Sequence, residues 1–529
     1  MSQVVRSAGA VVVGMLLTTP IFAQDHVHPP GATEKLGTVQ FETSCTADVA
    51  PEFNRAVALL HSFEFGASIR AFSAVAARDT TCAMAHWGLA LSHWGNPMAP
   101  GLRAPALLAR GRTAAETAAR LAVTASGRER LYIAAVQQLF ADYETRAQQE
   151  RVEAYERAMR EVVARLPDDT EARIFHALAL AASASPTDKS YARQLEAGAL
   201  LESLLARQPD HPGIAHYIIH SYDYPALAGR AAAAARRYAE IAPSAAHALH
   251  MPSHTFTRVG MWQESINTNL RSMGVARRDR SWAEVLHAAD YAMYAYLQVR
   301  NDSAARTILA ELPGAAAQFD PNAVTGAAPG SAGLFALAAI PARYALEREA
   351  WRDAAELQPK ATAFPYTDAL TYFARALGAA HTGDVARIRQ SIDSLGAFSE
   401  RLVASGEPYW AEQVAIQKLG AQAWLEHAEG RTDNALALMR RAADREDATE
   451  KSAVTPGPLA PARELLGDML LMLGKPAEAL VEYRKALERE PNRYRSLEGA
   501  RKAAAAAGDA EAAAGYAEQL AALTGARAQ

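Results

Sequence analysis

The sequence predicts an all-α protein, a solenoid built from stacked pairs of antiparallel helices. No segment alternates apolar and polar residues with a period of two, which is the pattern expected of a strand. Near the C-terminus, Gly474 and Ala479 recur as Gly508 and Ala513, each 34 residues later. A constant period of this length is typical of a repeat protein in which every unit is one helix pair.

The clearest helix pair lies in the C-terminal region. Its two helical stretches are punctuated by Leu466, Gly467, Gly474, Ala479, Tyr483, Ala486 and Pro491. Small residues let two antiparallel helices approach, large residues fill the space between them, and proline ends the second helix. The same scheme recurs upstream at Gly430, Ala435 and Ala442, at Trp351 and Ala354, at Gly260 and Trp262, and at Ser68, Phe72 and Val75.

This pattern resembles the tetratricopeptide repeat (TPR) family, and in particular exported bacterial TPR proteins. The resemblance implies an α-solenoid of TPR-like antiparallel helix pairs that forms a superhelix with a concave groove. It also implies the usual role of the family, which is to bind a peptide or a partner protein along the concave surface. Between Arg103 and Leu166 the repeat spacing is lost, and longer helices are expected.

Composition excludes several classes of function. The 529 residues are 50% hydrophobic and 21% charged, which is enough to bury a large core. The net charge of -4 provides no basic field for phosphates, so nucleic acid is not expected as a partner. Only two cysteines occur, which excludes Cys-rich zinc and iron–sulfur frameworks. Because no Walker loop and no GxGxxG motif is found, we expect no nucleotide cofactor.

The N-terminus has the features of a signal peptide over residues 1–23. A short apolar run follows one positive charge, and Ile21 and Ala23 occupy the minus-three and minus-one positions of a cleavage site. We expect cleavage near Ala23 and a periplasmic or secreted protein with no transmembrane segment in the mature chain. Export means oxidising conditions, so we expect Cys45 and Cys82 to form a disulfide.

Loop-like composition marks the expected boundaries between segments. Residues 320–333 are rich in Gly, Pro and Ala, and residues 448–461 contain three prolines, so both are expected to be linkers. The expected order is signal peptide 1–23, flexible N-terminal segment 24–48, N-terminal TPR-like solenoid with a His-rich groove 49–319, linker 320–333, middle TPR-like helices 334–447, Pro-containing linker 448–461 and C-terminal TPR pair 462–529.

Histidines are concentrated in one part of the chain, because seven of the 15 lie between His211 and His287. The repeat register makes Ala246 the first residue of an inner helix, and spacings of three and four residues then place three histidines on one face of it. The three stripes at equivalent positions of neighbouring inner helices are His216, His220 and Asp223, then His247, His250 and His254, then His287, Asp290 and Tyr294.

Two histidines four residues apart on a helix can reach one metal ion. We therefore predict that one transition-metal ion is bound in the groove by His216, His220, His250 and His254. Further ligands, or groups that orient the ligands, are expected among His247, His287, Asp223 and Asp290. Imidazole and carboxylate donors without thiolate suit Zn, Cu, Fe or Ni, and the choice stays open. Pro252 lies inside the second pair and predicts a kink in its helix.

Tyr217 and Tyr294 are also predicted to face the groove, where a phenol could donate a proton or bind a substrate. Tyr217 stands where the HExxH helix of zinc proteases has its general-base glutamate. A protease of that type is therefore disfavoured.

Three functions remain open. A histidine-bound ion with an open position would make the protein a metal-dependent enzyme with hydrolytic or oxidative chemistry, acting on a small molecule or other ligand in the groove. A closed coordination sphere would make it a metal-sequestering protein. Alternatively, the chain is a metal-free TPR scaffold that binds a peptide or partner protein.

Overall fold

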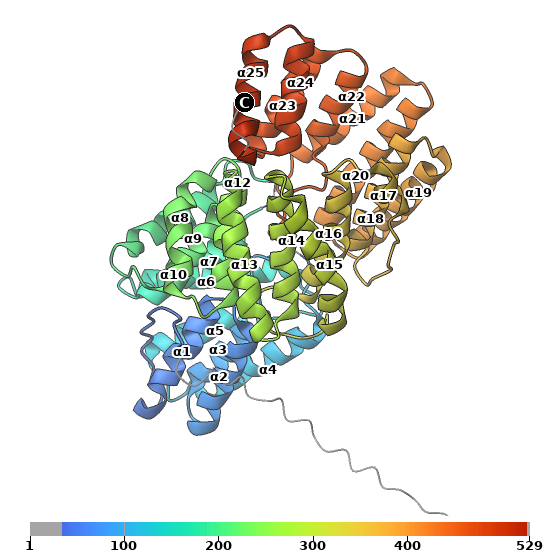
Figure 1. Cartoon of the computed structure of the whole chain (residues 1–529). Coiled ribbons are helices and arrows are strands. Elements are labelled where there is room, and N and C mark those ends of the chain that lie inside the picture. The colour runs from blue at the N-terminus through green and yellow to red at the C-terminus, as the bar shows by residue number, and fades with distance from the viewer. Residues whose placement is uncertain (1–33, 100, 186, 526–529) are drawn as a thin grey trace, which may run out of the picture. The chain divides into compact units, whose positions relative to one another are not determined.

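The computed structural model describes residues 34–99, 101–185 and 187–525, and the packed part of the chain begins at Lys35. Within these ranges every regular element is a helix and no strand occurs. Neighbouring helices pack as antiparallel pairs (Figure 1), so the prediction of an all-α, TPR-like solenoid is confirmed. The same ranges contain no helix with the length and apolar character needed to cross a membrane. The signal peptide predicted over residues 1–23 lies outside the described residues.

The first part of the chain runs from η1 to α8. The bounds are η1 (Ala47–Val49), α1 (Ala50–His61), α2 (Phe65–Arg78), α3 (Ala83–Trp94), α4 (Pro105–Leu121), α5 (Gly127–Gln137), α6 (Gln148–Arg165), α7 (Thr170–Ala182) and α8 (Ala192–Leu205). Side chains satisfy the free N–H groups at several helix starts. Ser126 and Glu129 form a capping box at α5, and Asp169 accepts the N–H of Ala172 at α7.

The middle of the chain contains shorter helices followed by long ones. The bounds are α9 (Pro212–Ser221), η2 (Ala228–Ala231), α10 (Ala232–Ile241), α11 (Ala246–His250), α12 (Pro252–Arg258), α13 (Trp262–Arg278), α14 (Trp282–Gln298) and α15 (Asp302–Gln318). Pro252 has no N–H to donate, so the inner helix is divided into α11 and α12 at the place where the sequence predicts a kink. Met251 keeps helical angles, φ -53° and ψ -36°, so one face continues across the break.

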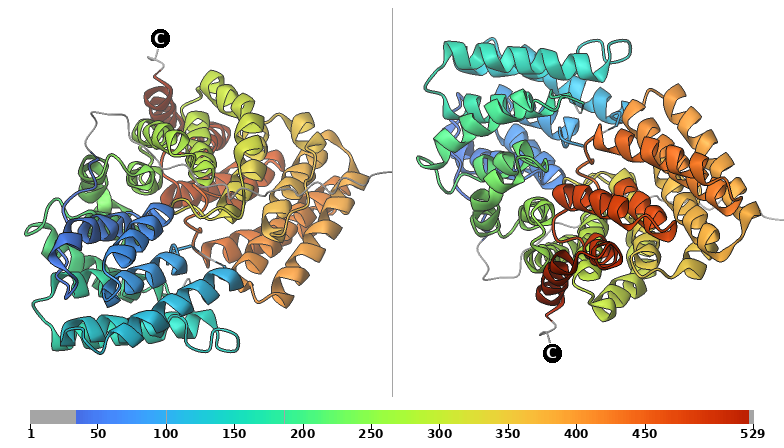
Figure 2. Two further views of the ribbon diagram at one scale, coloured as in Figure 1. Left: turned by 90° about the horizontal axis from the view of Figure 1, so that it is seen from below. Right: turned by 90° about the horizontal axis from the view of Figure 1, so that it is seen from above.

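The last part of the chain packs back against the middle. The bounds are α16 (Gly330–Leu346), α17 (Trp351–Glu356), α18 (Pro365–Thr382), α19 (Val385–Ala404), α20 (Pro408–Ala428), α21 (Thr432–Asp447), α22 (Ala462–Met472), α23 (Pro476–Arg489), α24 (Tyr494–Ala506) and α25 (Ala510–Thr524). Figure 2 shows the dark red C-terminal helices beside the green helices of the middle. Trp262 Nε1 donates to the carbonyl of Asn492 at 2.9 Å. Gly260 is required at this contact, because a Cβ there would lie 2.3 Å from the carbonyl oxygen of Pro491.

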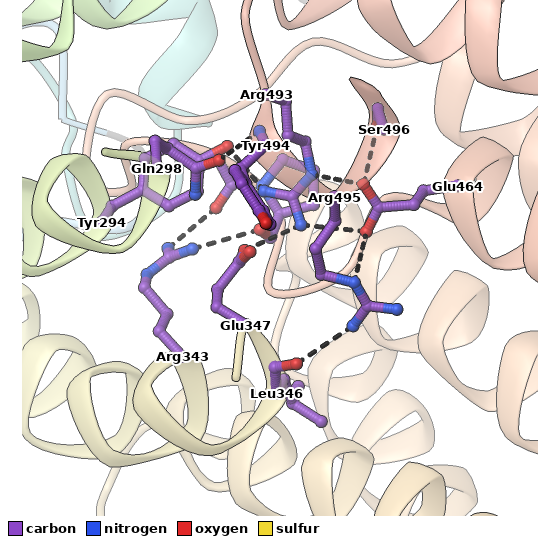
Figure 3. A network of polar contacts seen from close by, with 12 residues as sticks. Tyr294, Gln298, Arg343, Leu346, Glu347, Glu464, Arg493, Tyr494, Arg495 and Ser496 are labelled. Carbon is purple, nitrogen blue, oxygen red and sulfur yellow. Dashed lines mark hydrogen bonds and ion pairs between the residues drawn. The ribbon is translucent and has the colours of Figure 1, made fainter. Parts of the chain in front are cut away.

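A buried ion network also connects α14 and α16 with the C-terminal repeats (Figure 3). The guanidinium of Arg493 lies 2.8 Å and 3.0 Å from the two carboxylate oxygens of Glu464, and 2.7 Å from Glu347. It also donates to the hydroxyl of Tyr294 at 2.9 Å. The side chains of Arg493 and Glu464 are 0% exposed, so neither charge can be left unpaired without a large loss of stability.

The N-terminal segment is folded from Lys35 onward, contrary to the prediction that residues 24–48 are flexible. Leu36, Val39 and Phe41 are buried, and the ring centroid of Phe41 lies 5.2 Å from that of Trp87. Apolar side chains in irregular backbone have no helical period, which is why the sequence pattern did not reveal their burial. Cys45, in the same segment, is joined to Cys82 by a disulfide.

Both segments predicted to be linkers belong to the packed structure as well. Helix α16 begins at Gly330, inside the range 320–333, and Ala327 and Ala328 just before it are buried. In the range 448–461, Glu450, Ser452 and Thr455 are buried. The backbone of this second segment is satisfied from within the protein, since the hydroxyl of Tyr291 lies 3.0 Å from the carbonyl of residue 453.

Candidate metal centre

Six imidazole rings come together at the centre of the histidine-rich region. They belong to His216 and His220 on α9, His247 and His250 on α11, His254 on α12 and His287 on α14. All six side chains are buried, with exposed fractions between 0% and 6%. The ring nitrogens form two groups of three, each group within a sphere that one metal ion could occupy.

The first group, which we call triad A, consists of His216, His220 and His247. Their ligand atoms all lie within 4.8 Å of one another. Nε2 of His216 lies 3.2 Å from Nε2 of His247. Nε2 of His220 is buried and has no hydrogen-bond partner. A buried, unpartnered nitrogen next to two others is an arrangement that a bound cation would satisfy.

The second group, triad B, consists of His250, His254 and His287, and its ligand atoms also lie within 4.8 Å of one another. Nε2 of His250 lies 3.1 Å from Nε2 of His254. The ring centroids of His250 and His287 are 4.5 Å apart, and Nδ1 of His287 has no hydrogen-bond partner. Two nitrogens bound to one ion at about 2.0–2.1 Å in tetrahedral geometry lie about 3.3 Å apart, close to the distances found in both triads.

Hydrogen bonds on the far sides of two rings fix the proton positions in triad B. Nδ1 of His250 lies 2.7 Å from Oδ1 of Asn269, whose amide nitrogen donates to the carbonyl of Ser265. Nδ1 of His254 lies 2.9 Å from the carboxylate of Asp223. Both Nδ1 atoms are therefore donors, and each neutral ring is left with a lone pair on Nε2. The two lone pairs face each other, which is repulsive unless a cation lies between them.

In triad A, a hydrogen bond on the far side of His216 fixes the proton position of that ring in the same way. Nδ1 of His216 donates to the carbonyl of His61 at 2.6 Å, so its Nε2 also carries a lone pair. Nδ1 of His247 and Oε2 of Glu284 are 4.0 Å apart, and neither has a hydrogen-bond partner. A small movement would let His247 donate to Glu284 and leave Nε2 of His247 free to bind a metal, as in carboxylate–histidine–metal arrangements.

Burial keeps these imidazoles neutral. Burial, together with the neighbouring His254 and Lys451, lowers the pKa of His220 and of His287 to about 3. Burial, with the neighbouring histidines, also holds the pKa of His216, His247 and His250 well below the ordinary value. Neutral imidazole is the form that binds metal ions. The centre therefore presents unprotonated ligands.

Asp223 connects triad B with two buried cations. Its Oδ1 lies 2.9 Å from Nε of Arg258 and 3.6 Å from Nζ of Lys451. Burial alone would raise the pKa of Asp223, but Lys451 and Arg258 outweigh it and hold the pKa well below the ordinary value. Burial, and to a smaller extent the positive charge of Arg258, lowers the pKa of Lys451 to about 8. Asp223 thus stays charged and orients the ring of His254.

The structure groups the predicted ligands differently from the sequence analysis. His216 and His220 fall in one triad and His250 and His254 in the other, so the four do not form a single set. His247 and His287, predicted as further ligands or orienting groups, complete the two triads. The reason is that α11 lies between α9 and α14. His247 therefore faces the histidines of α9, while His250 faces His287 of α14.

Three other predicted residues lie outside the triads. Asp290 pairs with Arg343 at 2.8 Å. The hydroxyl of Tyr217 lies 3.0 Å from Nδ1 of His61, and the hydroxyl of Tyr294 donates to Glu490 at 2.5 Å. Both tyrosines are buried.

Three residues that support the centre were not predicted from the sequence. Asn269 lies on the outer helix α13, and nothing in its sequence context indicates that it meets His250. Glu284 lies three residues before His287 on α14, so the helical spacing could have indicated it. Lys451 lies in the segment taken for a linker, where a single lysine carries no signal.

Two cavities adjoin the triads. The first offers about 30 Å³ to the centres of water-sized molecules, room for one or two of them. Its lining includes His220 and His247 of triad A, His254 and His287 of triad B, and Asn96, Tyr366, Trp410 and Val454. The second offers about 180 Å³ and is lined by Met98, His220, Asp223, Tyr224, Tyr409, Glu450, Lys451, Ser452 and Ala453. Both cavities reach His220.

A third group of potential ligands lies behind triad A. Nε2 of His61 and Nε2 of His211 each lie 2.9 Å from one oxygen of Glu171. Each carboxylate oxygen is thus already bonded to an imidazole, and the carbonyl of His61 holds His216. This group supports the position of triad A.

Comparisons with known proteins identify no family for this chain. No family model matches the chain, and no curated protein does. Among solved structures, "Human IFIT1 dimer with PPP-AAAA" is similar with a TM-score of 0.41 and 13% sequence identity, covering 91% of this chain and 96% of that one. "Human IFIT1 dimer with m7Gppp-AAAA" is similar with a TM-score of 0.37 and 11% identity, covering 83% and 90%.

Proposed function

We propose that this protein is an exported metalloprotein that binds transition metal through triads A and B and acts as a metal-dependent enzyme on a small molecule. One observation carries the proposal: Nε2 of His250 and Nε2 of His254 are 3.1 Å apart, while the Nδ1 atoms of both rings are committed as donors. A metal ion between the two nitrogens uses both lone pairs.

The composition of the centre supports a transition metal. All six donors of the two triads are imidazoles, and the nearby carboxylates of Asp223 and Glu284 lie behind the rings. Imidazole suits Zn, Cu, Fe and Ni, whereas Mg and Ca require oxygen ligands. The signal-peptide pattern supports a periplasmic or secreted location for this activity.

The adjoining cavities favour an enzyme over a sequestering protein. An ion held by three imidazoles keeps a position for water or substrate, as catalytic sites do, whereas storage sites close their coordination sphere. Four of the six histidines line the 30 Å³ cavity, so a small molecule there would meet the ions directly. Chemistry of the hydrolytic or oxidative kind is available to such an ion.

The test is the metal content of the protein, purified without a chelator and without a polyhistidine tag. We expect stoichiometric transition metal, lost in the double variant His250→Ala/His254→Ala with the far-UV circular dichroism unchanged. His427→Ala, on α20, is the matched control and keeps the metal. Absence of metal both after purification and after reconstitution would overturn the proposal and favour the metal-free scaffold that binds a peptide or partner protein.

A further inference from the structure

We infer that the centre holds two copper ions side by side, one in each triad, and that a small ligand in the adjoining cavity contacts both. The inference rests on the proposed function and specifies the number of ions, their identity and the class of ligand. The sequence predicts one ion, whereas the geometry divides the ligands into two sets of three histidines.

Each triad is sufficient for one ion by itself. In triad A the closest pair of ring nitrogens is 3.2 Å apart, and in triad B it is 3.1 Å apart. Each triad also contains ring nitrogens that are buried without a partner, Nε2 of His220 and Nδ1 of His247 in triad A and Nδ1 of His287 in triad B. Three imidazole donors with a fourth position open is a stable way to hold a reactive metal ion.

The two triads are neighbours. The ring centroids of His220 and His254 are 6.1 Å apart, and those of His247 and His250 are also 6.1 Å apart. These separations between triads are no larger than the widest separation within one, which is 6.3 Å between His254 and His287. Two ions placed within the triads would therefore be adjacent.

The 30 Å³ cavity joins the two positions. Two of its lining histidines, His220 and His247, belong to triad A, and two, His254 and His287, belong to triad B. A molecule of one to three heavy atoms placed there would lie beside both ions. The pair is thus arranged to bind a small bridging ligand, of the class that includes dioxygen, hydroxide and azide.

The donor set favours copper. Cu²⁺ binds nitrogen ligands more tightly than the other divalent first-row metals, and mononuclear iron oxygenases use two histidines with a carboxylate. Neither triad contains a carboxylate ligand, because Asp223 bonds to the outer nitrogen of His254 and Glu284 lies on the outer side of His247. Two cations in a buried site also need carboxyl groups nearby. Asp223 lies behind His254 of triad B, Glu284 lies beside His247 of triad A, and Glu64 accepts the backbone N–H of His247 at 3.2 Å.

The experiment counts copper and measures its magnetic state. The full chain, without a polyhistidine tag, is loaded with copper, and copper per chain is measured together with the Cu(II) electron paramagnetic resonance signal before and after azide. We expect two copper ions per chain and a signal much weaker than the copper content, since two Cu(II) ions joined by a bridging ligand couple their spins. Azide should change the optical spectrum with one azide per pair.

Single variants separate the two positions. His220→Ala and His287→Ala each remove one ring with an unpartnered nitrogen, the first from triad A and the second from triad B. Each should halve the copper content and give a full-intensity signal of isolated Cu(II), and the double variant should lose most copper. His427→Ala should change neither value.

Any other result would overturn either this inference or the proposed function. One copper ion per chain, lost in both single variants, would overturn the inference and leave the proposed function intact. Two copper ions with full signal intensity in the wild type would show that they share no ligand and would also overturn it. Zinc in place of copper in protein from cells supplied with both metals would overturn the identity. No metal at all would refute the proposed function itself.

Discussion

Asp223 accepts the Nδ1 proton of His254 at 2.9 Å and is itself paired with Arg258 at 2.9 Å. One carboxylate therefore fixes the orientation of a metal-ligand candidate and neutralises a buried cation. The consequence is that metal affinity and folding stability depend on the same side chain.

Asp223→Asn is expected to weaken metal binding by about 10-fold to 100-fold, the range found when an orienting partner of a ligand is removed. It should also reduce the free energy of unfolding by about 3–5 kcal/mol, because Arg258 and Lys451 are left buried without a counter-charge. Metal titration and urea unfolding measure the two effects.

Asp210→Asn, which removes an exposed pair with Arg237, is the control and should change stability by less than about 1 kcal/mol. Unchanged metal affinity in Asp223→Asn would contradict the orienting role.

Asn269→Ala removes the acceptor that holds the Nδ1 proton of His250. We expect metal affinity to fall about 10-fold or more, because the ring of His250 is then free to rotate or to change its tautomer. Asn267→Ala, two residues earlier on the exposed side of α13, is the matched control and should bind metal as the wild type does. Equal metal affinities for the two variants would show that Asn269 does not orient the ring of His250 for metal binding.

Arg493→Met removes the central cation of the network in Figure 3. The carboxylates of Glu464 and Glu347 would be left buried near each other, so the free energy of unfolding should fall by about 3–5 kcal/mol. Chemical denaturation measures the change. Arg501→Met, which removes a partly exposed pair with Glu498 on α24, should cost less than about 1 kcal/mol. A similar loss in both variants would argue against the network as the main connection.

Glu446 should make the stability of the metal-free protein depend on pH. Burial raises the pKa of its carboxyl from 4.5 to about 7, and Ala462 N–H donates to it at 2.7 Å. Between these values the folded state keeps a proton that the unfolded state releases, so this group lowers stability as pH rises from 4.5 through 7.

In Glu446→Gln the decrease in unfolding free energy between pH 5 and pH 8 should be smaller than in the wild type, since an amide does not titrate. Unfolding by urea at the two pH values measures the decrease. Glu478→Gln, at an exposed pair with Lys475, should retain the wild-type difference. If Glu446→Gln retains it too, the carboxyl does not carry the pH dependence.

Much of the fold could be predicted from local patterns. The small residues Gly474 and Ala479 and their counterparts 34 residues later indicate stacked helix pairs, because only small side chains let the helices approach. The predictions for residues 24–48, 320–333 and 448–461 were less successful. From Lys35 onward, and in the two predicted linkers, burial depends on contacts such as that of Phe41 with Trp87, which no local pattern encodes.

For the candidate site, spacing alone establishes that His216 and His220 share a helical face, as do His250 and His254, because 3.6 residues complete one turn. Spacing does not establish which rings meet across helices. That depends on how α9, α11 and α14 pack, which is determined by side chains along their whole interfaces. The tertiary structure alone joins His247 to triad A and His287 to triad B, and it alone brings Asn269, Glu284 and Lys451 to their outer sides.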